Sequence, residues 1–402
     1  MHVIHPDPTM PHPTTANTLP HDAERATLVG RAWQPGVGPV LVAAHDGALH
    51  DLTRIAVTSS QLLELDGAAA RVRAALVSGE LPRLADLAPT LANSVEATRD
   101  LTRPWLLAPC DLQVIKASGV TFVASLLERV IEEQARGDAA KALGIRQALG
   151  EVLGERLSGI VPGSAQAAQV KQILLQQGAW SQYLEVGIGP DAEIFTKAPV
   201  LSAVGTGADV GIHPASAWNN PEPEVVLAVN SRGVTVGATL GNDVNLRDVE
   251  GRSALLLGKA KDNNASCAIG PFIRLFDEHF GMADVRRCEV TVEVAGPEGF
   301  QLRGGSSLTQ ISRDPLDIVA QAIGPNHAYP DGFMLFLGTM FAPVQDRHGP
   351  GQGFTHVVGD VVSVSTPALG GLVNRVTTSD RAAPWAFGLT ALMKNLAGRG
   401  LL

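Results

Sequence analysis

The most regular hydrophobic pattern of the chain is a pair of apolar runs bounded by turn-forming residues. Residues 225–229 (Val-Val-Leu-Ala-Val) are apolar and mostly β-branched, which is typical of a buried strand. Residues 234–240 predict a second strand, and the Gly-Asn-Asp that ends this run is a turn signal. Nearer the start, residues 27–33 and 39–44 predict two strands, and Asp46-Gly47 predicts a hairpin after the second.

Helices are predicted in longer stretches of Ala- and Leu-rich sequence. These stretches cover residues 62–78, 84–94, 125–136, 139–153 and 165–177. The chain also holds 42 glycines and 26 prolines, which suit a turn-rich fold with many short strands. This pattern is compatible with several folds that mix helices and strands, so the pattern alone does not fix the architecture.

The length of the chain, 402 residues, is enough for two or three domains with a sizeable core. We divide it into a mobile tail over residues 1–24, an N-terminal domain over 25–109 and a larger domain over 110–402. The tail is rich in His, Pro and Thr and has no apolar segment after a basic start, unlike a secretory signal. The N-terminal domain receives no chemistry; a scaffold or oligomer-contact role is the default.

Charge and cysteine content exclude some classes of function. The net charge of −9, without a run of Lys and Arg, argues against nucleic acid as a partner. No apolar stretch reaches the length of a membrane span. Three scattered cysteines, Cys110, Cys267 and Cys288, do not suit a disulfide framework or a zinc site, and we expect a cytoplasmic protein.

Three carboxylates beside the two central strands are the strongest candidates for chemistry. Glu222 and Glu224 are separated by one residue, so in an extended backbone both side chains point the same way. Asp243 lies in the turn after the second strand. Carboxylates that converge repel one another unless a cation joins them, and oxygen ligands suit Mg²⁺, Mn²⁺ or Ca²⁺. The alternative is a solvated strand edge and an ordinary turn.

The same region carries an ordered set of motifs that resembles the fumarylacetoacetate hydrolase superfamily. Glu-x-Glu before a strand is followed by Asn-Asp-Val-x-x-Arg-Asp and then by a Gly-Lys segment that leads to Ile-Gly-Pro. Each piece is weak alone, but the order covers roughly residues 110–380. The further matching segments are 195–199 (Phe-Thr-Lys-Ala-Pro), 330–332 (Pro-Asp-Gly), 337–339 (Leu-Gly-Thr), 359–362 (Gly-Asp-Val-Val) and 369–374 (Leu-Gly-Gly-Leu-Val-Asn).

The resemblance implies an α+β fold that is mostly β, with a mixed, rolled sheet in the larger domain and a small N-terminal domain. It implies Mg²⁺, with Mn²⁺ as an alternative, held by Glu222, Glu224 and Asp243. It also implies a 2-oxo acid substrate and a homodimer or homotetramer.

The resemblance further assigns residues to the reaction and to substrate binding. Of two nearby lysines, Lys259 and Lys261, the distance to the Ile-Gly-Pro motif selects Lys261 as the catalytic base. Desolvation and a nearby cation would lower the pKa of this lysine. Substrate contacts fall on Lys197, Arg247 and Thr339.

The segment before the helix at 125–136 departs from the pattern of the superfamily's hydrolases. Carbon–carbon hydrolases carry a His with a Glu here, whereas this chain has no His between His50 and His213. The absence favours elimination of water from a 2-keto-3-deoxy sugar acid, as in the 2-keto-3-deoxy-pentonate dehydratase branch, which makes 2,5-dioxopentanoate. Glu128, Glu132 or Glu133 remains as the acid or base, and we favour Glu128 as the residue that protonates the leaving C4 hydroxyl.

Two other functions stay open at the level of sequence. A hydrolase that cleaves a carbon–carbon bond of a 2,4-diketo acid would need a water-activating base from elsewhere, such as Glu132 or Glu133. A metal-binding scaffold without catalysis would turn over no 2-oxo acid, and the lysine at position 261 argues against it.

Overall fold

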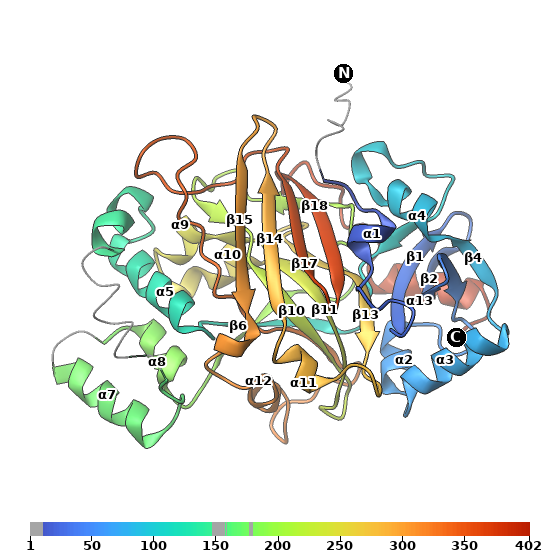
Figure 1. Cartoon of the computed structure of the whole chain (residues 1–402), viewed down its shortest axis with the longest axis horizontal. Coiled ribbons are helices and arrows are strands. Elements are labelled where there is room, and N and C mark those ends of the chain that lie inside the picture. Colours follow the sequence, from blue (N-terminus) through green and yellow to red (C-terminus); the bar gives the residue numbers. More distant parts are fainter. Residues whose placement is uncertain (1–10, 147–156, 158, 177–179) are drawn as a thin grey trace.

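The computed structural model describes residues 11–146, 157, 159–176 and 180–402, and two β-sheets form its framework (Figure 1). Within these residues the smaller sheet has five strands, in the spatial order β15 (Gln301–Ser307), β14 (Glu289–Ala295), β17 (Val361–Thr366), β18 (Gly370–Thr378) and β8 (Asp209–Ile212). The larger has eleven, in the order β4 (Arg83–Asp86), β3 (Ala48–Asp51), β2 (Gly38–His45), β1 (Leu28–Gln34), β13 (Cys267–Leu275), β11 (Thr235–Asp243), β10 (Pro223–Val229), β16 (Phe333–Phe336), β6 (Val114–Gly119) and β7 (Glu193–Ala198), with β5 (Trp105–Leu107) paired to β1.

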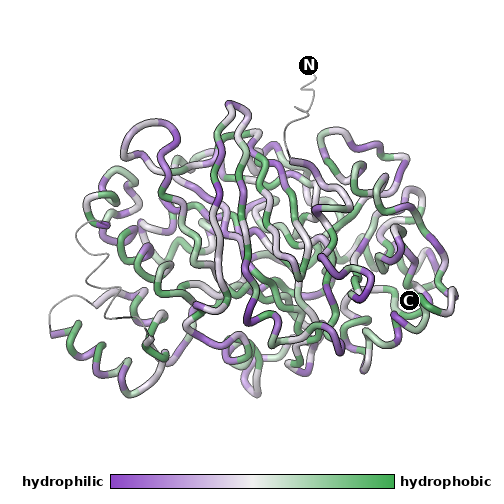
Figure 2. Tube along the Cα trace, viewed as in Figure 1, coloured by the Kyte–Doolittle hydropathy of each residue, from purple (hydrophilic) through white to green (hydrophobic). Residues whose placement is uncertain are grey.

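Both faces of the central strand β10 are buried, which explains the apolar run over its residues 225–229. Val225 and Leu227 lie in the core between the two sheets, with Val292 of β14. Val226 and its neighbour Ala228 belong to a second core on the other face of the large sheet. Figure 2 shows hydrophobic positions along the central strands and mainly hydrophilic positions in the outer loops.

The N-terminal part confirms the predicted hairpin and corrects one predicted helix. Strands β2 and β3 are antiparallel, and Asp46-Gly47 forms the turn between them. The helix predicted over 62–78 is two helices, α2 (Ser59–Glu64) and α3 (Ala68–Ser78). They separate at Gly67, whose φ of 66° is a left-handed conformation that glycine adopts readily. Helix α4 (Leu87–Ser94) follows strand β4.

The predicted division into domains remains a prediction, because the large sheet is continuous across it. Strand β1 pairs with β13, with Leu28 opposite Arg274. Residues 11–24, predicted as part of a mobile tail, pack on the fold: α1 (Thr15–Thr18) contacts β18, and Asp22 forms an ion pair with Arg274 at 2.7 Å. Residues 1–10 of that predicted tail lie outside the described residues.

A helical insertion between β6 and β7 stands at one end of the molecule (Figure 1). It contains α5 (Val123–Ala135), a helix over 139–146, α7 (Ala165–Gln176) and α8 (Gln182–Ile188). Residues 147–153 of the predicted helix at 139–153 lie outside the described residues. The same is true of residue 177, the last of the predicted helix at 165–177. The insertion has its own hydrophobic core, built from Leu126, Val130, Leu174 and Leu184 among others.

The remaining elements are short. A two-stranded pair, β9 (Asn219–Asn220) and β12 (Asn245–Leu246), lies beside the central strands. The other helices are α9 (Arg247–Glu250), α10 (Leu257–Lys261), α11 (Met282–Val285), α12 (Pro315–Ala322) and α13 (Leu389–Gly398). The α+β class is confirmed, although helix and strand contribute similar amounts in the described residues rather than a clear excess of strand.

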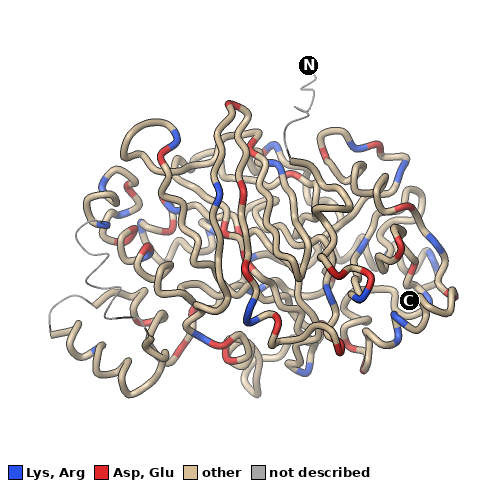
Figure 3. The backbone as a smooth tube through the Cα atoms, in the orientation of Figure 1, with Lys and Arg blue, Asp and Glu red and all other residues tan. Residues whose placement is uncertain are grey.

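Acidic and basic residues are interspersed along the described part of the chain (Figure 3). Among the described residues, no helix combines the length and the apolar character needed to cross a membrane.

Candidate active site

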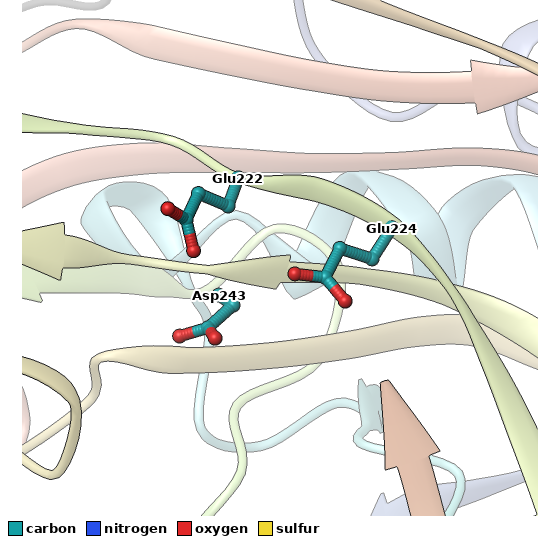
Figure 4. A group of neighbouring side chains, drawn as sticks. All are labelled: Glu222, Glu224 and Asp243. Atoms are coloured by element: carbon teal, nitrogen blue, oxygen red, sulfur yellow. The ribbon is translucent and has the colours of Figure 1, made fainter. Parts of the chain in front are cut away.

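The three carboxylates at the ends of β10 and β11 converge in space (Figure 4). The two strands are antiparallel, with Glu224 opposite Gly241, so Glu222 and Glu224 lie next to the end of β11, where Asp243 stands. One oxygen of each carboxylate lies within 4.8 Å of the others. All three side chains are buried, so the alternative of a solvated strand edge does not hold.

The electrostatics of this triad fit a cation site. Burial raises the pKa of Glu224 well above its usual range, and the negative charges of Asp243 and Glu222 raise it further. Burial acts the same way on Asp243, but Lys197 and Lys261 outweigh it and lower the pKa of this carboxyl. Three buried carboxylates close together are a hard, oxygen-only donor set with excess negative charge, which is the environment that Mg²⁺ prefers.

Lys261 lies directly against the triad. Its ammonium contacts Glu222, and its distance to Asp243 Oδ2 is 3.1 Å. Lys259 and Lys261 both lie on helix α10, which directs them to different sides, so Lys259 is exposed and Lys261 is buried. The geometry therefore selects the lysine that the resemblance had selected.

The expected direction of the Lys261 pKa shift is wrong for the protein without a metal. Burial disfavours the ammonium form, but the negative charges of Asp243, Glu222 and Glu250 outweigh burial and raise the pKa. The predicted lowering therefore requires that another cation first neutralise these carboxylates.

Two of the three predicted substrate contacts are engaged with protein groups instead. Lys197 is fully buried, forms an ion pair with Asp243 Oδ1 at 2.8 Å and donates to the carbonyl of Val244, so it supports the triad from behind. Arg247 lines the pocket, but its guanidinium lies 4.3 Å from the ring centre of Trp218 and is held by acidic groups of α5. Both substrate roles stay predictions.

Thr339 remains an available substrate contact. It follows strand β16 and lines the same pocket as the triad. Its hydroxyl oxygen accepts a hydrogen bond from the N–H of Phe341, which leaves the hydroxyl proton to be donated.

The predicted proton donor, Glu128, lines the pocket but is engaged by two arginines. Arg146 binds both of its carboxylate oxygens at 2.7 Å, and Arg247 binds Oε2 at 2.9 Å. Glu132, one helical turn further along α5, is likewise paired with Arg129 and Arg247. A proton on Glu128 would have to displace one of these hydrogen bonds, so the geometry does not favour its predicted role.

Sequence reasoning missed two acidic residues of the pocket. Glu193, at the start of β7, lines it, and burial raises the pKa of its carboxyl. Glu250, at the end of α9, also lines it; burial raises its pKa to about 7, although Arg129 opposes this shift. The available signals were proximity to the 195–199 motif for Glu193 and a three-residue distance from Arg247, one helical turn, for Glu250.

Arg129 is the third residue that the sequence did not single out. It lies on α5, and the structure buries its guanidinium among acidic residues. The guanidinium contacts Glu132 at 2.6 Å, Glu222 at 2.7 Å and Glu250 at 3.1 Å.

Solved structures show which class of fold surrounds this site. The apo 2-keto-3-deoxy-D-arabinonate dehydratase matches with a TM-score of 0.59 and 20% identity, over 87% of this chain and 99% of that one. Fumarylacetoacetate hydrolase from Exiguobacterium antarcticum matches with a TM-score of 0.53 and 17% identity, over 88% and 100%. The chain therefore has the fumarylacetoacetate-hydrolase fold.

At the level of sequence, the chain resembles sugar-acid dehydratases. It is 29% identical to 2-dehydro-3-deoxy-D-arabinonate dehydratase of Saccharolobus solfataricus over 184 residues, 46% of this chain and 58% of that protein. It is 28% identical to a probable 2-keto-3-deoxyxylonate dehydratase of Haloferax volcanii over 196 residues, 49% and 64%. The match thus spans less than two thirds of either relative, and no family model matches.

Proposed function

We propose that this protein is a Mg²⁺-dependent hydro-lyase that converts a 2-keto-3-deoxy-pentonate to 2,5-dioxopentanoate and water in pentose catabolism. The observation that carries the proposal is the buried triad with Lys261 against it, in a pocket that also holds acidic groups with raised pKa. Two similar proteins are dehydratases of this kind by name, and a solved structure of similar fold is 2-keto-3-deoxy-D-arabinonate dehydratase in complex with magnesium and 2,5-dioxopentanoate.

Glu222, Glu224 and Asp243 would hold the magnesium ion. Once bound, the ion supplies Lewis-acid stabilisation of negative charge on a substrate oxygen. Lys197 fixes Asp243 from behind through the 2.8 Å ion pair, and the N–H of Gly338 donates to Glu224. These contacts keep both carboxylates in place, which is the usual task of groups behind a metal ligand.

Lys261 takes the proton from C3 of the substrate. Lys261 lies against the triad and lines the same pocket, which supports this role. The attraction that raises its pKa comes largely from Asp243 and Glu222, whose charge a bound dication would neutralise.

A second group must protonate the C4 hydroxyl so that it leaves as water. Glu128 was the choice from sequence, but its hydrogen bonds to Arg146 and Arg247 favour another residue. Glu193 suits the role better. It lines the pocket and is only partly exposed to solvent, and this incomplete exposure raises the pKa of its carboxyl. Loss of the C3 proton and the C4 hydroxyl gives water and a 3,4-unsaturated 2-oxo acid that keeps its C5 hydroxyl. Removal of a proton from C5 and return of a proton to C3 then give the C4–C5 enol, which tautomerises to the aldehyde of 2,5-dioxopentanoate.

The alternative is a hydrolase that cleaves a carbon–carbon bond of a 2,4-diketo acid. It needs a base that activates water, and no His is among the described residues that line the pocket. Glu193 or Glu250 would have to serve instead. The fold alone does not exclude this reaction, because a fumarylacetoacetate hydrolase shares it.

The test is an assay with Mg²⁺ and each C4 epimer of 2-keto-3-deoxy-pentonate, with detection of 2,5-dioxopentanoate. We expect product that EDTA abolishes. Lys261→Met should lose turnover while calorimetry still detects Mg²⁺ binding; an active Lys261→Met variant would contradict the role of the base. Pyruvate released from a 2,4-dioxo acid, with no dehydration, would establish the hydrolase instead, and no turnover of either substrate would favour a scaffold.

We also propose that the enzyme is cytoplasmic and forms a homodimer or homotetramer, as the resemblance implies. Light scattering of the purified protein tests the assembly, since a monomer at micromolar concentration would contradict it.

A further inference from the structure

The guanidinium of Arg129 joins the helical insertion to the triad. It donates to Glu222 Oε1 at 2.7 Å and to Glu132 Oε2 at 2.6 Å, and it lies 3.1 Å from Glu250 Oε2. The other oxygen of Glu222 contacts Lys261. Both oxygens of this carboxylate are thus held by cations, one from α5 and one from α10.

We infer that Arg129 is a positioning residue that sets the affinity of the site for Mg²⁺ by fixing the carboxylate of Glu222. This inference rests on the proposed metal site. Glu222 directly precedes β10, and its carbonyl accepts a hydrogen bond from the N–H of Asp243, so its backbone is fixed beside β11. The direction of its carboxylate is then set by the side chains that hold its oxygens, Arg129 and Lys261. Hydrogen bonds to the carboxylates that bind a metal orient them, and the loss of such a partner typically lowers metal affinity about 10- to 100-fold.

The shape of the arginine side chain matters more here than its charge. A guanidinium presents donors in a planar fork, so one side chain reaches Glu222, Glu132 and Glu250 at once. A lysine has the same charge but a single ammonium, which cannot keep this geometry. Arg129→Lys therefore separates the positioning effect from a change in net charge at the site.

Another arginine of the insertion, Arg146, supplies a matched control. Arg146 binds Glu128, and Glu128 in turn binds Arg247, but Arg146 contacts no member of the triad. Arg146→Lys thus makes the same chemical change in the same insertion, without touching a proposed metal ligand.

The experiment is calorimetric titration of Mg²⁺ into wild type, Arg129→Lys and Arg146→Lys, with thermal melting of each metal-free protein. We expect the dissociation constant for Mg²⁺ to be at least about tenfold higher in Arg129→Lys than in wild type. We expect wild type and Arg146→Lys to have the same dissociation constant. An unchanged dissociation constant in Arg129→Lys would overturn the inference. Equal weakening in both variants would also overturn it, because it would indicate general loosening of α5.

Failure of the proposed function gives a different result. If wild type itself binds no Mg²⁺, the proposed metal site is wrong, and the inference about Arg129 is overturned with it. If wild type binds Mg²⁺ but dehydrates no sugar acid, the reaction fails while the comparison of the three dissociation constants remains valid. Equal melting temperatures of the two variants in EDTA would show that a change in affinity does not follow from unfolding.

Discussion

Seven carboxylic side chains line the pocket in the described part of the chain, and their surroundings divide them into three groups. Glu222, Glu224 and Asp243 face one another and suit a cation. Glu128 and Glu132 are neutralised by arginines within the insertion and α9. In Glu193 and Glu250, burial outweighs the opposing charges of Arg129 and Lys261 and raises the pKa, which suits them to hold a proton.

The first prediction at the scale of single residues compares two candidate proton donors. Glu193→Gln should lower kcat about 100-fold or more, which is the usual range for loss of a general acid. Glu128→Gln should lower it less, because that side chain is bound to Arg146 and Arg247. Steady-state kinetics at saturating Mg²⁺ checks both; a larger loss at Glu128 would restore the original assignment from sequence.

Glu250 supplies a prediction about pH. Its pKa is raised from about 4.5 to about 7, so the folded protein binds a proton more tightly than the unfolded chain does. The stabilising contribution is present below pH 4.5 and disappears as pH rises through about 7. The free energy of unfolding of wild type, relative to Glu250→Gln, should therefore fall across this window.

Urea unfolding of both proteins in EDTA, at intervals from pH 4.5 to 8, measures that difference. A difference that is constant with pH, or one that rises, would show that Glu250 does not hold its proton in the folded state. The absolute stability of Glu250→Gln is not diagnostic, since the variant also changes the contact with Arg129.

At the scale of elements, the site depends on close packing between β10, β11 and β16. Gly241 of β11 lies opposite Glu224, and a methyl group there would lie 2.2 Å from the ring of Phe336 and 2.7 Å from Val226. Glycine is required at this position because the neighbouring strand leaves no space for a side chain. The proposed metal ligands are thus carried by a pair of antiparallel strands that is packed closely against Phe336 of β16.

Gly241→Ala should therefore destabilise the fold by about 1–3 kcal/mol, the usual range for overpacking. Gly258→Ala is the control, because Gly258 is exposed, lies in helix α10 and has no atom within 4 Å of the added methyl group. That change should be neutral or stabilise the protein by about 0.5–1 kcal/mol. Denaturant unfolding of the two variants measures both effects, and equal stability would argue against the tight contact with Phe336.

At the scale of the whole molecule, the large sheet, helix α10 and the insertion each contribute to one site. The triad comes from the large sheet, Lys261 from α10 and Arg129 from the insertion. Figure 1 shows the insertion at the opposite end of the molecule from the N-terminal strands, which continue the same sheet. Occupation of the site should consequently stabilise parts of the chain that are far apart in sequence.

Mg²⁺ should raise the melting temperature of the intact protein. A ligand at 100 times its dissociation constant adds about 2.7 kcal/mol of stability when it binds the folded state alone. Glu224→Gln should abolish this rise, whereas Glu293→Gln, on the exposed face of β14, should retain it. Scanning fluorimetry with and without EDTA distinguishes these results; an equal rise in both variants would place the ion elsewhere.

Local patterns in the sequence determined the parts of the site that depend on neighbouring residues. Alternation of side chains along a strand placed Glu222 and Glu224 on one side. Antiparallel pairing of β10 with the next strand, β11, then brought Asp243 beside them, because pairing of strands that follow one another in sequence is largely a local property. The hairpin at Asp46-Gly47 followed from turn chemistry in the same way.

Only the tertiary structure decided what each charged side chain does. Lys197 and Arg247 meet partners that are distant in sequence, so their ion pairs could not be read from the motifs around them. The raised pKa of Glu193 and of Glu250 likewise comes from burial by several separate segments. Burial and charge environment are sums over neighbours in space, whereas the sequence specifies directly only neighbours along the chain.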